Sequence, residues 1–389
     1  MSQFKQISDK NAKVLYLETS ALGQSLLTTP KLNKGSAFSE LERQQFHLRG
    51  KLPYNIEDLS QQVLRCYQQF LKKDNNLEKH LYLRSLHDTN ETLFYKLVSQ
   101  HLTEMLPVLY TPTVGKAVEQ FSQEFQRPRG LYIAYPDRDH IEEIIENRFN
   151  SEVDIIVMTD GAGVLGIGDQ GIGGMDICIV KSMVYVLCGG VNPSRLLPIQ
   201  IDVGTDNEQL LNDPMYLGWR HPRISGKEYD DMVERVVLAI QRKLPQAYLH
   251  WEDFGRENAR RNLERYHQQM CTFNDDMQGT GAVTLVALLS AITRTKVPLT
   301  EQRIVIVGAG TAGTGIADQL CAAMRREGLS QQEALSRFYL VGRHGLLHQA
   351  MPELTAFQKP YARSDLAETG TNLSLHEVVK RFKPSVLIG

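Results

Sequence analysis

Cysteine is scarce in this chain of 389 residues, and its five cysteines are scattered, with no C-x-x-C pair. Small secreted scaffolds depend on closely spaced, bridged cysteines, so this pattern favours a reduced protein over a disulfide framework. Residues 1–6 also lack the apolar segment of a secretory signal peptide. We therefore expect a cytoplasmic location. The cysteines are Cys66, Cys178, Cys188, Cys271 and Cys321.

An excess of charge and a long hydrophobic run are missing too. Lys plus Arg total 43 and Asp plus Glu total 45, a formal net charge of −2. This balance gives no reason to expect nucleic acid or an anionic membrane as a partner. The longest mostly apolar stretch, 282–292, is too short to span a bilayer and predicts a buried helix. The motifs H-E-x-x-H and G-x-S-x-G do not occur. The sequence therefore gives no sign of the zinc-binding helix of metallopeptidases or of the nucleophile turn of α/β-hydrolases.

The spacing of apolar residues changes along the chain. Residues 1–35 carry turn signals and predict irregular structure, whereas 36–125 have apolar residues at helical spacing. From about residue 130, short apolar runs alternate with helical ones, which predicts a parallel α/β sheet. Its expected strands are 131–135, 154–158, 197–203 and 247–251.

A second α/β unit begins near residue 279, with strand-like runs at 303–307, 338–341 and 385–388. The chain stops at Gly389, directly after the last of these runs. Ligand groups in open α/β sheets come from loops at the carboxyl ends of strands. We therefore expect the final domain to be incomplete.

Two acidic segments suggest a metal site. They are Trp251-Glu252-Asp253-Phe254 and the segment 273–281, which contains Asp275 and Asp276. Oxygen ligands suit Mg²⁺ and Mn²⁺. Neighbouring strand residues point to opposite faces, so each pair shares one ion only if the strand has ended or bulged. Negative charge at the start of the helix near residue 281 is the alternative interpretation; two acidic pairs flanked by aromatic residues favour metal.

A glycine loop predicts a dinucleotide site. Gly308, Gly310 and Gly313 form G-x-G-x-x-G after the strand-like run 303–307 and before a helical run, which is the setting of a Rossmann turn. No carboxylate follows the next strand, where an acidic residue would bind the ribose. Arg343 in that position could meet the 2′-phosphate of NADP or could be a solvated surface arginine.

A further loop, residues 159–174, carries seven glycines after a strand-like run. Such a loop lets backbone approach a ligand closely, although a mobile turn is the alternative. Lys181 follows in an apolar run; burial would lower its pKa and make it a base, whereas a lysine reaching to the surface is the commoner case. Tyr110, taken alone, reads as a core or turn tyrosine.

Taken together, these segments resemble the malic enzyme family over essentially the whole chain. The matching stretches are 110–115, 127–131, 159–174, 202–207, 251–254, 273–276 and 308–313. The resemblance implies a helical N-terminal oligomerisation region over 1–125, an α/β malate- and metal-binding domain over 126–278, and a Rossmann-type NAD(P)-binding domain over 279–389. It also implies L-malate as substrate, NAD as cofactor with NADP as the alternative, and a homodimer or homotetramer.

The resemblance also assigns residue roles. Lys181 would be the general base, with Asp275 beside it, and Tyr110 the general acid. The implied ligands of Mn²⁺ or Mg²⁺ are Glu252, Asp253 and Asp276.

Several positions depart from the malic enzyme pattern. Gly163 stands where an arginine usually pairs with a malate carboxylate, and Asp176 stands where glycine is usual. Both changes resemble malolactic enzymes, a related group that returns the hydride and releases lactate. Gly342 replaces the usual ribose-binding aspartate. Oxidative decarboxylation of malate to pyruvate is the leading hypothesis, lactate formation is the alternative, and a truncated, non-catalytic binding protein is the third.

Overall fold

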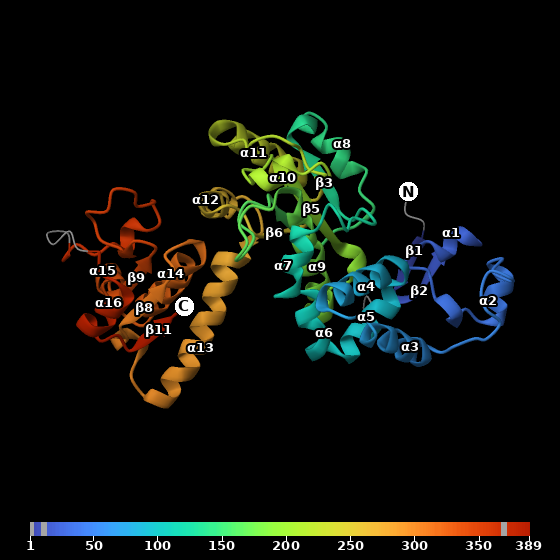
Figure 1. Cartoon of the computed structure of the whole chain (residues 1–389), viewed down its shortest axis with the longest axis horizontal. Helices are drawn as coiled ribbons and strands as arrows, with labels where there is room; N and C mark the ends of the chain where they lie inside the picture. The colour runs from blue at the N-terminus through green and yellow to red at the C-terminus, as the bar shows by residue number, and fades with distance from the viewer. Residues whose placement is uncertain (1–3, 9–13, 367–371) are drawn as a thin grey trace. The chain divides into compact units, whose positions relative to one another are not determined.

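The structure, a computed structural model, describes residues 4–8, 14–366 and 372–389. Internal contacts divide the chain into two compact units, Met1–Ala247 and Tyr248–Gly389. Figure 1 colours the first from blue to yellow-green and the second from yellow to red. A helical region, parallel strands and a Rossmann-type unit are all present, which confirms the predicted α/β class. The predicted boundaries, 1–125, 126–278 and 279–389, are not decided by this division and stay predictions.

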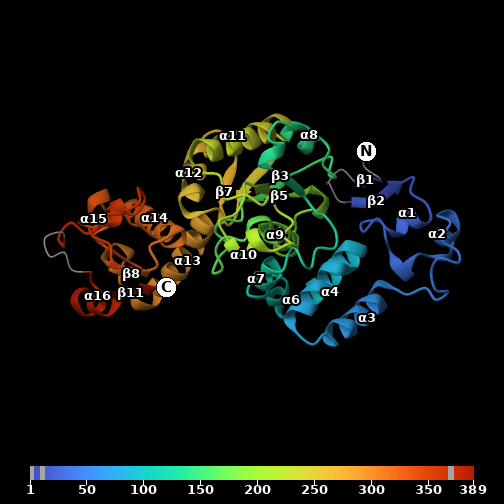
Figure 2. The ribbon, with the colours of Figure 1, turned by 45° about the horizontal axis from the view of Figure 1, so that its top comes forward.

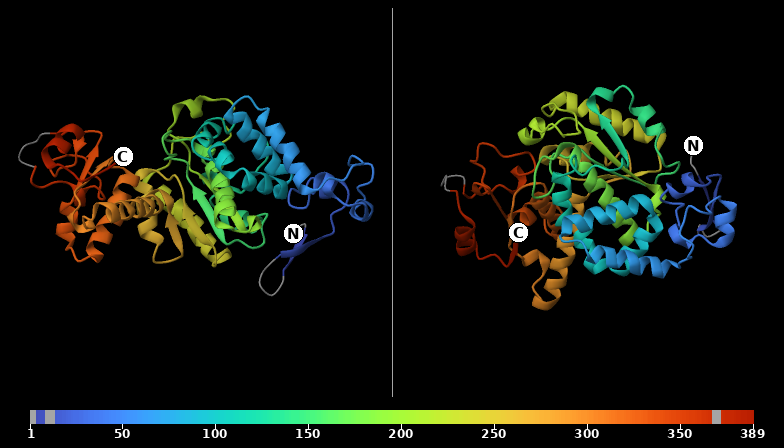
Figure 3. Two further views of the ribbon diagram at one scale, coloured as in Figure 1. Left: turned by 90° about the horizontal axis from the view of Figure 1, so that it is seen from below. Right: turned by 45° about the vertical axis from the view of Figure 1, so that its right-hand side comes forward.

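The beginning of the chain contains more regular structure than the sequence predicted. Strands β1 (Phe4–Ser8) and β2 (Val14–Thr19) pair antiparallel, and the short helix α1 (Gln24–Leu27) follows. Figure 3 shows this hairpin in dark blue. The expectation of irregular structure over 1–35 is therefore wrong for the described residues. Strands this short, with mixed side chains, leave little periodic signal in a sequence.

Helices fill the region from 36 to 125, as predicted. They are α2 (Glu40–Gln45), α3 (Leu59–Leu71), α4 (Asn76–Thr89), α5 (Glu91–Gln100), α6 (Leu102–Leu109) and α7 (Thr113–Glu119). Ser39 and Asp58 begin α2 and α3 with capping boxes, which satisfy backbone N–H groups of the first turn. The apolar faces of α3, α4 and α5 meet in one core through Phe70, Leu83 and Phe94.

The first unit also contains a parallel arrangement of strands in the order β3–β5–β4. Their bounds are β3 (Leu131–Ala134), β4 (Ile155–Thr159) and β5 (Leu196–Asp202), close to the predicted runs. Helices α8 (Ile141–Glu146) and α11 (Gly226–Lys243) pack against each other, and α8 contacts β3. The short helix α10 (Glu208–Asn212) follows β5.

Helix α9 (Gly174–Gly189) lies inside the first unit, where it contacts β4 and β5 and also α5 and α7. Figure 2 shows it between β5 and α7. Contact on both sides explains why it is apolar around most of its circumference. The run Gly171–Gly189 is longer than the stretch 282–292 that was expected to be the longest apolar one, so that expectation is wrong. The run is long and apolar enough to cross a membrane, but 67% of its apolar window is buried inside the protein. Burial of this kind is typical of a core helix, so the run is weak evidence for a membrane span.

The second unit begins with a parallel pair of strands, β6 (Tyr248–Trp251) and β7 (Thr272–Asn274), joined through α12 (Arg256–Tyr266). A π-helical turn, Asp275–Gly279, leads directly into α13 (Thr280–Thr295). The predicted burial of 282–292 is wrong, because Val283 is 71% and Val286 63% exposed. An apolar run shows composition and not what covers it, and several side chains of this run are exposed in the part of the chain that the structure describes.

A four-stranded sheet of order β10–β9–β8–β11 forms the rest of the second unit. Its strands are β8 (Ile304–Val307), β9 (Phe338–Gly342), β10 (Gly345–Leu346) and β11 (Val386–Ile388), with β10 antiparallel to β9. Ile304 and Ile306 face the core of α14 (Thr311–Arg326), whereas Val305 faces Val378 of α16 (Leu375–Phe382). This alternation places helices on both faces of the sheet, as in a doubly wound fold.

Candidate functional site

Lys181 and Tyr110 lie close together in the first unit. Lys181 is in the middle of α9 and is only 8% exposed, and its Nζ is 5.0 Å from the centroid of the Tyr110 ring. Tyr110 directly follows α6 and precedes α7, which packs on α9. The structure therefore excludes the interpretation of Lys181 as a surface lysine. A cation beside an aromatic face is stabilised by the ring quadrupole, and the contact holds the two side chains in one geometry.

The glycine-rich loop 159–174 folds tightly on itself. Gly161 has a φ of 65°, and a Cβ on it would lie 2.2 Å from the carbonyl oxygen of Gly171. Only glycine fits such an approach of two backbone segments. The loop is therefore closely packed where Gly161 meets Gly171, as the predicted close approach of its backbone requires.

Arg223 braces the same loop from outside. Its Nε and Nη2 donate to both oxygens of Asp169, at 3.0 and 2.6 Å, and its Nη1 donates to the carbonyl oxygen of Asp160 at 3.0 Å. Tyr229 donates to the Asp160 carboxylate at 2.7 Å. Burial raises the pKa of Asp160, and Arg223 and Tyr229 oppose that rise. These braces were not predicted, because they join residues far apart in the sequence.

Asp176, which departs from the malic enzyme pattern, pairs with Arg84 of α4 at 2.5 Å. Both side chains are largely buried, with exposed fractions of 14% for Arg84 and 11% for Asp176. Burial opposes the charge of Arg84, but the Asp176 carboxylate more than compensates and raises the guanidinium pKa. The ion pair thus connects α4 to the first turn of the helix that carries Lys181.

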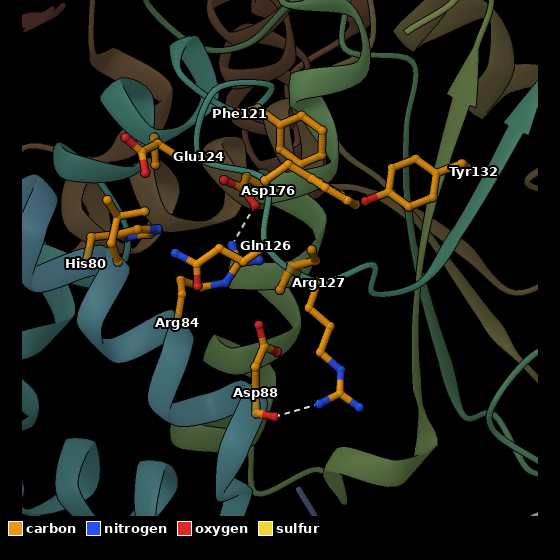
Figure 4. Close-up of a pocket in the computed structure, with 13 residues that line it drawn as sticks. His80, Arg84, Asp88, Phe121, Glu124, Gln126, Arg127, Tyr132 and Asp176 are labelled. Carbon is orange, nitrogen blue, oxygen red and sulfur yellow. Dashed lines mark hydrogen bonds and ion pairs between the residues drawn. The ribbon is translucent and has the colours of Figure 1, made fainter. Parts of the chain in front are cut away.

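The pair lines a small cavity of about 40 Å³, shown in Figure 4. His80 and Tyr132 contribute to its wall, and Asp88 and Arg127 lie together at its lower end in the figure. Among the described residues, Nε2 of His80, Nε of Arg84 and the Tyr132 hydroxyl have no hydrogen-bond partner. Polar atoms around a cavity of this size are commonly satisfied by ordered water, so the cavity needs no further ligand to explain it.

In the second unit, His250, Glu252 and Asp275 form a group that could hold a cation. Their ligand atoms all lie within 4.8 Å of one another. His250 Nε2 contacts Glu252 Oε2, and both residues are almost fully buried. A carboxylate-rich group with one imidazole is chemically suited to a divalent ion.

Only Glu252 belongs both to this group and to the predicted ligand set. Asp276 accepts a hydrogen bond from the backbone N–H of Asp253 at 2.9 Å, and Asp253 has a φ of 53°. The strand ends at Trp251, which is the break that two adjacent acidic residues need if they are to share an ion. The assignment of Glu252, Asp253 and Asp276 as ligands stays a prediction. His250 was overlooked, although its i, i+2 spacing to Glu252 was a usable signal.

The predicted dinucleotide turn has the expected local structure. It runs from the end of β8 through Gly308, with a φ of 107°, and Gly310, the N-cap residue, into α14. A Cβ on Gly313 would lie 1.7 Å from the carbonyl oxygen of Gly308, so this position requires glycine for close strand–helix packing. Arg343 follows Gly342 at the carboxyl end of β9; its predicted role in cofactor binding stays untested.

Comparison with known proteins gives consistent results for both parts of the chain. Residues 87–267 match the family model of the malic enzyme N-terminal domain, and residues 277–389 match that of the malic enzyme NAD binding domain. An NAD-dependent malic enzyme of Aeromonas hydrophila is 50% identical over 371 residues, covering 94% of this chain and 66% of its own length. One from Vibrio parahaemolyticus is 50% identical over 372 residues, with coverage of 94% and 66%.

The chain thus spans slightly less than two thirds of the length of these two curated relatives. Among solved structures, the malic enzyme of Entamoeba histolytica aligns with 20% identity and a TM-score of 0.44, covering 88% of this chain and 60% of that one. A likeness at that TM-score supports no argument about the site.

Proposed function

The chain belongs to the malic enzyme family, and on that premise we propose that it catalyses NAD- and divalent-metal-dependent oxidative decarboxylation of L-malate to pyruvate and CO₂. The 50% identity to NAD-dependent malic enzymes over 94% of the chain is the observation that carries the proposal. The Lys181–Tyr110 contact, the acidic group and the glycine turn are each consistent with it.

In this proposal, Lys181 is the general base and Tyr110 the general acid. Lys181 takes the proton of the malate C2 hydroxyl as C2 is oxidised, and Tyr110 later protonates C3 of the enol that decarboxylation leaves. Burial supports the role of Lys181, because the amine lies inside the protein beside Tyr110 and not at the surface. Asp275 is the third predicted catalytic residue and is also a candidate metal ligand in the group with His250.

The cofactors supply the remaining chemistry. When bound, a divalent cation polarises the C2 oxygen and stabilises negative charge as CO₂ departs, and a nicotinamide accepts the hydride. Glu252, with Asp253 and Asp276 as predicted, would hold Mn²⁺ or Mg²⁺. The turn formed by Gly308, Gly310 and Gly313 would bind NAD, the cofactor in the names of the relatives.

Three further statements remain part of the proposal. We expect a homodimer or homotetramer, which light scattering of the purified chain would measure. We expect a cytoplasmic location, which fractionation of the source cells would test. We also expect Arg343 to be dispensable for NAD binding. Arg343→Ala should therefore change the affinity for NADP but leave the affinity for NAD within about threefold, which is a smaller change than the loss of one charge-assisted hydrogen bond would cause.

The decisive experiment is incubation of the purified chain with L-malate, Mn²⁺ and either NAD or NADP. Absorbance reports reduced cofactor, and pyruvate and lactate are assayed together. Pyruvate in equal amount to NADH supports the proposal. Lactate without NADH would assign the malolactic reaction, which Gly163 and Asp176 favour by sequence. Absence of both products would overturn catalysis by this chain and leave only a binding function.

A further inference from the structure

We propose that His80 is a positioning residue for Tyr110: its imidazole N–H holds the end of α6, so that the Tyr110 ring keeps its place beside Lys181. The inference rests on the proposed function in taking Tyr110 as the general acid. It goes beyond that function because it assigns a role in the reaction to a residue of α4, which acts through the backbone of a neighbouring helix.

The end of α6 is fixed by side chains from outside that helix. Tyr110 is the C-cap residue of α6, and the last carbonyl groups of a helix have no partner inside it. Nδ1 of His80 lies 3.0 Å from the carbonyl oxygen of Val108. The hydroxyl of Thr113 donates to the carbonyl oxygen of Pro107 at 2.8 Å. Two side-chain donors therefore set where the backbone of Tyr110 begins.

The imidazole of His80 has one hydrogen to give, and the contact with Val108 uses it. A carbonyl oxygen only accepts, so Nδ1 must carry the hydrogen. His80 is fully buried, and burial, together with Arg84 beside it, lowers the pKa of the ring, which is therefore neutral. The other ring nitrogen, Nε2, has no hydrogen-bond partner within residues 14–366, and His80 lines the cavity of Figure 4.

Helix α4 connects the two elements that carry the proposed acid and base. His80 and Arg84 are four residues apart and so lie on one face of α4; Figure 4 shows both on this helix. Arg84 pairs at 2.5 Å with Asp176, in the first turn of the helix that carries Lys181. One turn of α4 thus ties the end of α6 to the start of α9, and His80 supplies the tie on the Tyr110 side.

Loss of this tie should affect the reaction more than it affects substrate binding. Without the His80 N–H, the Val108 carbonyl loses a donor inside the protein, and the end of α6 is free to shift. Proton transfer depends steeply on position, and a displacement of about 1 Å can lower a rate about 100-fold. A misplaced acid weakens the transition state and leaves the ground state largely intact, so kcat should fall while KM changes little. A residue that only stabilised the fold would lower the Tm without this pattern.

Steady-state kinetics with malate on the full chain provides the first test. His80→Phe keeps a ring but removes the donor, whereas His80→Asn places an amide N–H near the position of Nδ1. The control is His87→Phe, at a second buried histidine of α4 whose ring nitrogens have no hydrogen-bond partner in the described ranges.

We expect His80→Phe to lower kcat about 10- to 100-fold and to change KM for malate by less than about threefold. His80→Asn should recover most of the lost kcat, and His87→Phe should match the unsubstituted protein. If His80→Phe matched His87→Phe, or if His80→Asn were no more active than His80→Phe, the proposal would be overturned.

A second measurement follows Tyr110 itself and needs no turnover. Fluorotyrosine is incorporated at position 110 alone, where the fluorine resonance responds to the surroundings of the ring, including the charge of Lys181. We expect the resonance to shift or broaden in His80→Phe and to stay in place in His80→Asn and His87→Phe. The expected shift in a chain without turnover would count against the proposed function alone. Turnover with an unmoved resonance in His80→Phe would count against the role of His80 alone.

A third measurement decides the case in which His80→Phe fails to fold. Nitrogen NMR of the unsubstituted chain with isotope-labelled histidine shows which ring nitrogen carries the hydrogen, and the spectrum of His80→Asn identifies the signals of His80. A neutral ring with its hydrogen on Nδ1 near neutral pH supports the proposal. A hydrogen on Nε2 instead would overturn it, because Nδ1 would then have none to donate to Val108.

Discussion

The ammonium group of Lys181 lies over the ring of Tyr110, 5.0 Å from its centroid. The two residues come from α9 and from the segment between α6 and α7, and a shared core holds these elements together. An acid and a base that act on adjacent carbons of one small substrate must be close neighbours, so this contact is the geometric feature of the first unit that best suits the proposed reaction.

Removing either side chain should abolish most of the activity. Lys181→Met keeps an unbranched apolar stem but loses the amine, and Tyr110→Phe keeps the ring but loses the hydroxyl. Each should lower kcat by roughly 10²- to 10⁴-fold, the usual contribution of a general acid or base. Lys227→Met, at a largely exposed lysine of α11, serves as the control. If Lys181→Met retained more than a tenth of the control's kcat, Lys181 would not be the base.

The buried Arg84–Asp176 pair should matter for stability mainly when it is half removed. Arg84→Met or Asp176→Ala alone leaves one charge without its partner and should cost about 3 kcal/mol or more of unfolding free energy. The double variant should recover much of that loss, because no unpaired charge remains. The exposed pair Arg235–Asp139 provides the control double-mutant cycle, and its coupling energy should be less than about 1 kcal/mol.

Urea unfolding of the four proteins in each cycle gives the coupling energies. If Arg84→Met or Asp176→Ala lost no more unfolding free energy than a single variant of the exposed pair, other groups would already compensate the buried charges.

The first unit should lose stability in mild acid because of buried histidines. Burial, together with Arg129 and Arg84, holds the pKa of His87 well below its usual value. The unfolded chain binds a proton near pH 6.5 and the folded chain does not, so the stabilisation is complete above pH 6.5. It is lost as the pH falls below that value, by up to about 1.4 kcal/mol per pH unit for each proton.

His87→Phe should reduce this acid sensitivity, because phenylalanine cannot be protonated and the site is aromatic: the His87 ring is 4.6 Å from that of Phe94. Thermal unfolding at pH 7.5 and 5.5 measures the difference. His140→Gln, at an exposed histidine, is the control. Equal acid losses in His87→Phe and in the unsubstituted protein would exclude His87 as a source of the effect.

The glycine turn of the second unit should not tolerate a methyl group at Gly313. A Cβ there would lie 1.7 Å from a backbone oxygen of Gly308, so Gly313→Ala forces the strand and helix apart. We expect a loss of about 1–3 kcal/mol in stability and a loss of at least tenfold in NAD affinity, measured by calorimetry. Gly115→Ala in α7, where a Cβ meets nothing within 4 Å, should have neither effect. Unchanged NAD affinity in Gly313→Ala would place the cofactor elsewhere.

Local patterns predicted much of the fold. The strands around 155–159 and 304–307 were predicted because each is a short, continuous apolar run. The N-terminal hairpin was missed because its strands are short, and the burial of α13 was predicted wrongly because an apolar run does not say what covers it.

The sequence by itself determined the alternation of strands and helices, the glycine turn at 308–313, the acidic character of 251–254 and the likeness to malic enzymes. These features depend on neighbouring residues or on motifs with a fixed spacing. Only the tertiary structure decided that Lys181 is buried against Tyr110, that Arg84 meets Asp176, and that Arg223 braces the 159–174 loop. The physical reason is that such contacts join residues tens of positions apart, whose meeting depends on how whole elements pack.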